Sequence, residues 1–170
     1  PPSIQMKRFL TLTILAFVSA GASANFLKGV RDLVYDNSRD LVLTAAIHGT
    51  MAVIDVSDST QPVLVGSISP PSVADAHGLG YDFERNWAFI ASVSQSTVTC
   101  VDVSDPTSPR VISTVTNTTW LYYSTHLSYD SSRSMLFVVS AGSGDESSNA
   151  GHSITSVRVG ADGKMELLYR

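Results

Sequence analysis

This sequence of 170 residues has little cysteine and little charge, and it has no long apolar segment after its first residues. The single cysteine, Cys100, excludes a disulfide framework within the chain. Charged residues make up 15% of the chain and the net charge is −4, which excludes the basic surface that nucleic acids and anionic lipids require. The apolar runs are short and rich in Val, Ile, Thr and Phe, so they favour strands over helices.

The N-terminal residues have the features of a secretory signal. Residues 1–5 precede Met6 and are expected to be an upstream translation artefact. Two basic residues, the apolar residues 9–18 and the small residues 22–24 follow in the order that a signal peptide requires. The pattern predicts a signal-peptide helix over residues 6–24, whereas the alternative, a membrane anchor, needs about 20 predominantly apolar residues. Removal of the two basic residues would change the net charge from −4 to −6, and we expect a secreted protein with no membrane insertion after cleavage.

Two residues further along the chain, Cys100 and Asn117, relate to the expected secretion of the protein. Cys100 in "VTCVDV" holds the place of Val53 in "MAVIDV", which predicts a buried thiol that packs as a small apolar side chain. The alternative is a reactive or intermolecularly paired cysteine. Asn117 and the two threonines after it form an N-glycosylation sequon, which predicts a surface loop in a glycoprotein.

The chain repeats itself with spacings of 46 and 48 residues. Tyr-Asp-x-x-Arg followed by an apolar run occurs at Tyr35, Tyr81 and Tyr129. A second phrase, "MAVIDVSDSTQPVLVGSI" from Met51, returns as "VTCVDVSDPTSPRVISTV" from Val98. Self-similarity at this period is typical of propellers and other repeat arrays.

Each unit is expected to form four short strands, because its apolar runs are β-branched and bounded by turn residues. Runs such as "LVLTAA" and "AFIAS" are continuously apolar, as in a strand whose sheet is covered on both faces. Pro62 and Pro109 open the fourth strands, and proline is confined to strand starts and edges. The strands are predicted at residues 30–35, 40–46, 51–56 and 62–68, then 78–82, 87–92, 97–103 and 110–116, and finally 126–129, 135–140, 153–159 and 165–169.

These patterns predict an all-β fold made of β-propeller blades, each with four antiparallel strands. Blade 1 is expected at residues 25–75, blade 2 at residues 76–123, and a divergent blade 3, in a truncated chain, at residues 124–170. Closed propellers have about 4 to 8 blades. About three blades make an incomplete ring, so we expect remaining blades or partner chains to close it.

The repeats resemble a known family. "LVYDNSRDLVLTAAIHGTMAVIDVSDSTQPVLVGSI" and "FIASVSQSTVTCVDVSDPTSPRVISTV" look like LVIVD repeats, in which an apolar strand ends in Asp-Val-Ser before a proline-containing turn. The third unit, "ITSVRVGADG", keeps the strand and departs from that ending. The resemblance implies propeller blades and an extracellular or envelope setting, and it implies no reaction.

Propeller topology sorts the polar residues onto the two ends of the blades. We call the end with the first-to-second and third-to-fourth turns the aspartate face, and the end with the blade-to-blade connections and second-to-third turns the histidine face. The aspartate face has repeated residues, which predict turns closed by Asp side chains: Asp36, Arg39, Asp58, Asp82, Arg85, Asp105, Asp130 and Arg133. The histidine face has unrepeated residues, which form a candidate binding face: His48, His77, Trp120, Tyr122, Tyr123, His126, Asp145, Glu146 and His152.

Two functions follow from this arrangement. The first is a secreted module that binds a protein or a small extracellular ligand, with no catalytic residue and no cofactor. The alternative is a metal-dependent propeller enzyme, oxidoreductase-like, that uses His77 and His126 of the innermost strands as ligands of a divalent metal. These histidines precede their tyrosines by four and three residues, so they share a strand face only if a bulge at Gly78 or Gly80 intervenes.

Overall fold

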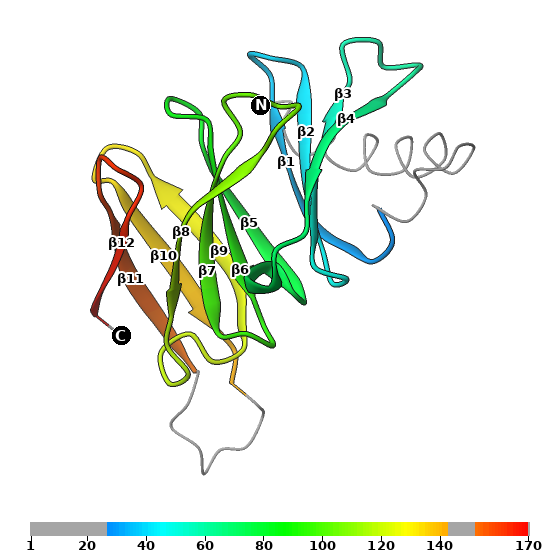
Figure 1. The fold of residues 1–170 in the computed structure, drawn as a ribbon. Helices are drawn as coiled ribbons and strands as arrows, with labels where there is room; N and C mark the ends of the chain where they lie inside the picture. Colours follow the sequence, from blue (N-terminus) through cyan, green and yellow to red (C-terminus); the bar gives the residue numbers. More distant parts are fainter. Residues whose placement is uncertain (1–26, 143–151, 170) are drawn as a thin grey trace, which may run out of the picture.

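The structure is a computed structural model that describes residues 27–142 and 152–169 (Figure 1). The predicted signal peptide at residues 6–24, together with Asp145 and Glu146, lies outside the described residues. The strands are β1 (Val30–Asp36), β2 (Leu41–Ala46), β3 (Thr50–Asp55), β4 (Val63–Ile68), β5 (Ala76–Asp82), β6 (Trp87–Ser92), β7 (Thr97–Asp102), β8 (Arg110–Thr116), β9 (Ser124–Asp130), β10 (Met135–Ser140), β11 (Ser153–Val159) and β12 (Met165–Tyr169), and one 3-10 turn, η2 (Pro71–Val73), precedes β5.

The strands form three four-stranded antiparallel sheets, which confirms the predicted all-β fold. Each sheet keeps the order of the sequence. In the structure, blade 1 is β1–β4, blade 2 is β5–β8 and blade 3 is β9–β12, and the residue that leads into a first strand is counted with the blade of that strand. The sheets stand side by side in Figure 1, with β5 between β1 and β9. This is the arrangement of consecutive blades in an incomplete propeller.

Apolar cores fill the two spaces between the blades. Leu43 and Met51 of blade 1 belong to the core that includes Ile90 of blade 2, and Phe89 of blade 2 belongs to the core that includes Leu136 of blade 3. None of these five side chains is exposed. Full burial of such a side chain contributes about 1.5–3 kcal/mol, so packing between sheets stabilises each blade. It also explains why β2 is buried along its whole length, as its continuously apolar sequence predicts.

The first strand of every blade carries a β-bulge at the same place. The register of β1 shifts between Val30 and Asp32, which makes Arg31 the extra residue. The shift between Ala76 and Gly78 makes His77 the extra residue in β5. In β9 the pairing partners change from His126 to Ser124, so Thr125 takes the same position. The bulge is therefore part of the repeat.

The repeated Asp residues close turns, as predicted. Oδ1 of Asp36 accepts the backbone N–H of Ser38 at 3.0 Å, and Oδ1 of Asp82 accepts that of Glu84 at 3.0 Å. On the third-to-fourth turn, Oδ1 of Asp58 accepts the backbone N–H of Thr60 at 2.9 Å, and Asp105 does the same in blade 2. Side chains of this kind replace backbone turn contacts, which is why Asp recurs at these places.

The repeated Arg residues have a second role that the sequence did not reveal. Nε of Arg39 donates to Oδ2 of Asp36 at 2.7 Å, and Nη1 donates to the carbonyl oxygen of Val103 in blade 2 at 2.8 Å. Nη2 of the same arginine donates to the hydroxyl of Tyr81, also in blade 2. We call this Asp–Arg pair and the tyrosine of the following blade the interblade latch.

The latch recurs between blades 2 and 3 in a looser form. Arg85 lies 3.7 Å from Asp82 and donates to the hydroxyl of Tyr129 in blade 3 at 3.4 Å. Blade 3 has its own Asp–Arg pair, in which Arg133 lies 2.8 Å from Asp130. The side chain of Arg133 is 73% exposed, whereas that of Arg39 is 23% exposed. The third latch therefore consists of its Asp–Arg pair alone. Within the described residues, no tyrosine of a following blade completes it.

Candidate binding face

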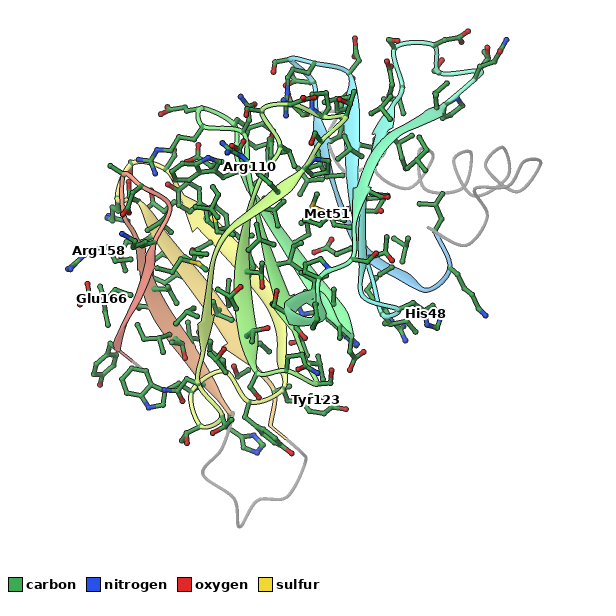
Figure 2. The ribbon with its side chains drawn as sticks, viewed as in Figure 1. His48, Met51, Arg110, Tyr123, Arg158 and Glu166 are labelled. Atoms are coloured by element: carbon green, nitrogen blue, oxygen red, sulfur yellow. The ribbon has the colours of Figure 1, made fainter. Side chains whose placement is uncertain are left out.

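The two ends of the blades carry different kinds of residue. In Figure 2, His48 and Tyr123 lie toward the lower end of the blades and Arg110 toward the upper end. His48 is in the turn between β2 and β3, and Tyr123 is in the connection between β8 and β9. Both elements belong to the histidine face, and Arg110 opens β8 next to the third-to-fourth turn of the aspartate face.

The residue that leads into each first strand has a left-handed backbone. Gly29, Asp75 and Tyr123 have φ values of 70°, 55° and 58°. Each offers its carbonyl oxygen to a backbone N–H that follows the second strand of the same blade, and for Tyr123 the donor is Ala141 at 3.1 Å. A positive φ crowds the Cβ atom of any residue except glycine. Blade 1 uses glycine here, and blade 3 places a tyrosine in the same conformation.

A second left-handed position lies before each third strand. Gly49, Ser96 and His152 have φ values of 78°, 53° and 49°. The imidazole of His152 packs against Gly142, where an added Cβ atom would lie 2.5 Å from Nε2. Blade 3 therefore holds two bulky side chains, Tyr123 and His152, at positions where blade 1 has glycines.

The left-handed residues of the aspartate face have a structural explanation. Asp40, Asn86 and Ser134 have φ values of 52° to 58°. Oδ1 of Asp40 accepts a hydrogen bond from the hydroxyl of Tyr35 at 2.9 Å. The side chains of Asn86 and Ser134 accept hydrogen bonds from two latch residues, Tyr81 and Arg85 respectively. In contrast, the side chains of Tyr123 and His152 make no hydrogen bond with any other described residue.

Tyr123 has an aromatic neighbour, Tyr122, in the same connection. The rings of Tyr122 and Tyr123 lie 6.2 Å apart at 52°, and Tyr123 is 44% exposed. Trp120 is half-buried. Its backbone is fixed because its carbonyl oxygen accepts hydrogen bonds from the hydroxyl groups of Ser140 and Thr155, both at 3.0 Å. The connection that carries Tyr123 is thus firmly attached to β10 and β11 while the tyrosine ring faces solvent.

Asn117 begins this connection. Its Oδ1 accepts the backbone N–H groups of Thr119 at 2.9 Å and Trp120 at 2.8 Å. The carbonyl half of the amide therefore stabilises the turn. Oligosaccharide would be attached to the other half, the amide nitrogen.

The structure does not place His77 and His126 at equivalent positions. His77 is the bulge residue of β5, and its counterpart in blade 3 is Thr125. The bulge does not restore the match, because it occurs at the same place in both blades. Nε2 of His77 lies 3.2 Å from Oδ1 of Asp75. His126 is exposed and corresponds to Gly78 of blade 2.

The described residues contain no group of three or more His, Cys, Asp and Glu side chains that could hold a metal ion. His48 is exposed at the tip of its turn. The remaining acidic candidates, Asp145 and Glu146, lie outside the described residues. The feature that sequence patterns missed is the left-handed backbone at Tyr123 and His152, which could have been found only by aligning these residues with Gly29 and Gly49.

Cys100 is fully buried in the core between blades 2 and 3. Burial raises the pKa of its thiol to about 12, with a smaller contribution from the carboxylates of Asp102 and Asp82. A thiol needs to lose its proton to react as a nucleophile or to form a disulfide. The prediction of a buried, structural cysteine is therefore confirmed.

Comparison with protein families finds a match to two segments of the chain. Residues 45–69 and 84–117 match the family described as LVIVD repeat. Both segments contain a third strand and the Asp-Val-Ser turn after it, β3 in blade 1 and β7 in blade 2. Over these two segments the chain is similar to LVIVD repeats. No curated protein matches the sequence.

Solved structures resemble the stacked blades at low sequence identity. A functionally unknown protein from Desulfotomaculum acetoxidans has a TM-score of 0.63 and 12% identity, with 82% of this chain and 41% of that chain covered. A protein from Lactobacillus plantarum has a TM-score of 0.64 and 17% identity, with coverage of 81% and 40%. The WD40 repeats of RRP9 have a TM-score of 0.63 and 13% identity, with coverage of 84% and 39%. WD40 repeats are propeller blades, so the likeness supports a partial propeller, and this chain spans about two fifths of each of these structures.

Proposed function

We propose that this LVIVD-repeat chain is a secreted binding module that contacts a protein or a small extracellular ligand with its histidine face. The observation that carries the proposal is the backbone of Tyr123, which is left-handed at φ 58° although the side chain is large and 44% exposed. Such a conformation costs on the order of 1–3 kcal/mol and is found at ligand-binding and active sites. Gly29 at the same position of blade 1 carries no such cost.

The chemistry of the neighbouring side chains suits recognition. Tyr122 and Tyr123 together offer apolar ring surface and hydroxyl groups, and tyrosine is enriched where proteins bind one another. His152 adds an exposed imidazole on the same blade. The alternative of a metal-dependent enzyme lacks comparable support, because His77 and His126 hold different positions in their blades.

A matched pair of glycine variants tests the face. Tyr123→Gly and Ser134→Gly both relieve a left-handed residue of blade 3, but only the first lies on the histidine face. The wild-type chain is first screened against arrays of secreted proteins, oligosaccharides and small extracellular metabolites, and we expect this screen to yield a ligand. Calorimetry then measures the affinity of each variant for that ligand. Tyr123→Gly should weaken binding at least tenfold and Ser134→Gly should leave it unchanged. Equal binding by the wild type and Tyr123→Gly would place the site elsewhere and refute the proposal.

Secretion is the second part of the proposal. It is supported by the signal pattern at residues 6–24 and by the sequon at Asn117. No helix within the described residues combines the length and the hydropathy of a membrane span. Expression in a eukaryotic secretory host should give medium-borne protein that lacks residues 6–24 and carries a glycan that Asn117→Gln removes. Retention of the unprocessed chain inside the cell, measured by intact mass, would contradict this part.

A further inference from the structure

Two cations at the start of blade 1 have no carboxylate partner. Every other lysine or arginine that the structure describes forms an ion pair with an aspartate or a glutamate: Arg39, Arg85, Arg110, Arg133, Arg158 and Lys164. Lys28 and Arg31 are exposed, and among residues 27–142 and 152–169 neither forms such a pair. An arginine whose charge the protein leaves unpaired is suited to bind an anion from solution.

Arg31 is also the extra residue of the bulge in β1. The bulge occurs in all three first strands, but its residue differs, and it is Arg31, His77 or Thr125. Bulges redirect side chains and are frequent next to active sites. A constant backbone feature that carries a different side chain in each blade is the arrangement of a scaffold with a site added to it. Since β1 lies beside β5, Arg31 and His77 hold equivalent positions of neighbouring strands.

The turn between β2 and β3 brings a second imidazole to the same place. An added Cβ atom on Gly29, which precedes β1, would lie 3.4 Å from Cδ2 of His48. The backbone N–H of Asp75, just before β5, donates to the carbonyl oxygen of Ile47 at 3.1 Å. In Figure 2, His48 lies at the lower end of blade 1. We call four residues at this junction of blades 1 and 2 the basic cluster: Lys28, Arg31, His48 and His77.

The two aspartates next to the basic cluster in the sequence have other partners. Oδ1 of Asp32 accepts the backbone N–H of Leu33 at 2.8 Å, and Oδ2 accepts that of Leu79 at 3.0 Å. Oδ1 of Asp75 lies 3.2 Å from Nε2 of His77. These carboxylates therefore serve the backbone and an imidazole, and the guanidinium and ammonium donors of the cluster stay available to a ligand.

We propose that the basic cluster binds a small ligand through an oxyanion, a carboxylate or a phosphate group. Arg31 donates two parallel N–H bonds to two oxygens of that group, a geometry that both anions accept, and Lys28 adds a second positive charge. Asp75 orients His77 through Nε2, so that Nδ1 is presented to the ligand. The inference rests on the proposed function, because it names the chemical class of ligand that the histidine face takes.

An NMR titration of the full chain tests the site. The probes are succinate, inorganic phosphate and the uncharged succinamide, each added at constant ionic strength. We expect succinate or phosphate to shift the Nε–H signal of Arg31 and the backbone amide signals of residues 28–32 and 76–79. Larger shifts with succinate would assign a carboxylate ligand, and larger shifts with phosphate a phosphate ligand. Unchanged signals with both anions, or equal shifts with succinamide, would overturn the proposal.

A matched pair of arginine variants makes the outcome specific. Arg31 and Arg158 are both exposed, but Arg158 already lies 2.9 Å from Glu166 in blade 3. We expect Arg31→Gln to weaken the affinity for the better anion at least tenfold and Arg158→Gln to leave it unchanged. His77→Gln should weaken the affinity by a smaller factor. The amide spectrum of each variant shows whether it is folded, and a folded Arg31→Gln chain with wild-type affinity would contradict the site.

This test and the test of the proposed function fail separately. Arg31→Gln with wild-type anion affinity, together with a screened ligand that Tyr123→Gly no longer binds, would overturn the oxyanion site and leave the proposed function standing. Anion binding that needs Arg31, together with a screened ligand that Tyr123→Gly still binds, would support the oxyanion site and refute the role of Tyr123.

Discussion

The side chain of Arg39 bonds Asp36 of its own blade and two partners in blade 2, Val103 and Tyr81, whereas that of Arg133 bonds only Asp130 among the described residues. Removal of Arg39 would leave the carboxylate of Asp36 buried without its cation. We expect Arg39→Ala to lower the free energy of unfolding by about 3 kcal/mol and Arg133→Ala, at an exposed pair, by about 1 kcal/mol or less. Urea denaturation of the two variants measures the difference. Equal urea midpoints would show that the contacts of Arg39 to blade 2 contribute nothing.

The carboxyl group of Asp36 also makes stability depend on pH. Burial raises its pKa, but the hydrogen bonds from Ser38 and Arg39 lower it more, so the pKa lies below its ordinary value. The unfolded chain has a pKa of about 3.9 for Asp. The stabilisation is therefore complete above that pH and is lost as the pH falls through the lower value of the folded state.

Asp36→Asn isolates this effect, because asparagine keeps an oxygen for the turn and removes the charge. We expect the variant to be less stable than the wild type at pH 7 by about 2 kcal/mol, the size of a hydrogen bond to a charged group. The gap should narrow as the pH is lowered stepwise below the ordinary pKa of an aspartate. Urea denaturation at each pH measures it, and a gap that stays constant with pH would assign the loss to packing.

At the level of strands, the contribution of one apolar position to the free energy of unfolding depends on the blade that carries it. Phe89 in β6 is buried between blades 2 and 3, while Phe137, at the same place in β10, is partly exposed. We expect Phe89→Ala to cost about 3–5 kcal/mol of unfolding free energy and Phe137→Ala about 1 kcal/mol. Denaturation midpoints of the two variants measure this. Equal losses would mean that β10 has a second cover in solution.

The strands themselves could be predicted from the sequence, and their surroundings only in part. Short apolar runs between turn residues gave the strands to within two residues at each end, because strand length and turn chemistry are local properties. The burial of the whole of β2, and of β6 after Trp87, followed from their apolar sequences. The equally apolar β10 alternates between buried and less buried residues, because its second face has no described neighbour.

The face that holds the candidate site could also be predicted, but its decisive geometry could not. Counting strands was enough to assign Tyr123 and the histidines to one end of the blades. The left-handed backbone at Tyr123 could be recognised from sequence only by aligning Tyr123 with Gly29, and the sequences around these two residues show no similarity. The different positions of His77 and His126 depend on bulges, which arise from the pairing of whole strands.

For the molecule as a whole, the two interblade cores predict an uneven distribution of stability. In a repeat array each unit is stabilised by its own folding and by its interfaces with its neighbours. Blade 2 has an apolar interface on both faces, with every residue of β7 buried, whereas β12 in blade 3 has no fully buried residue among Met165–Tyr169. Backbone amides exchange slowly where opening disrupts many buried contacts.

We expect the amides of β5–β7 to exchange at least tenfold more slowly than those of β11 and β12, as measured by hydrogen exchange with mass spectrometry. Uniform exchange across the three blades would mean that the sheets unfold as one unit and that burial between blades does not set their individual stabilities.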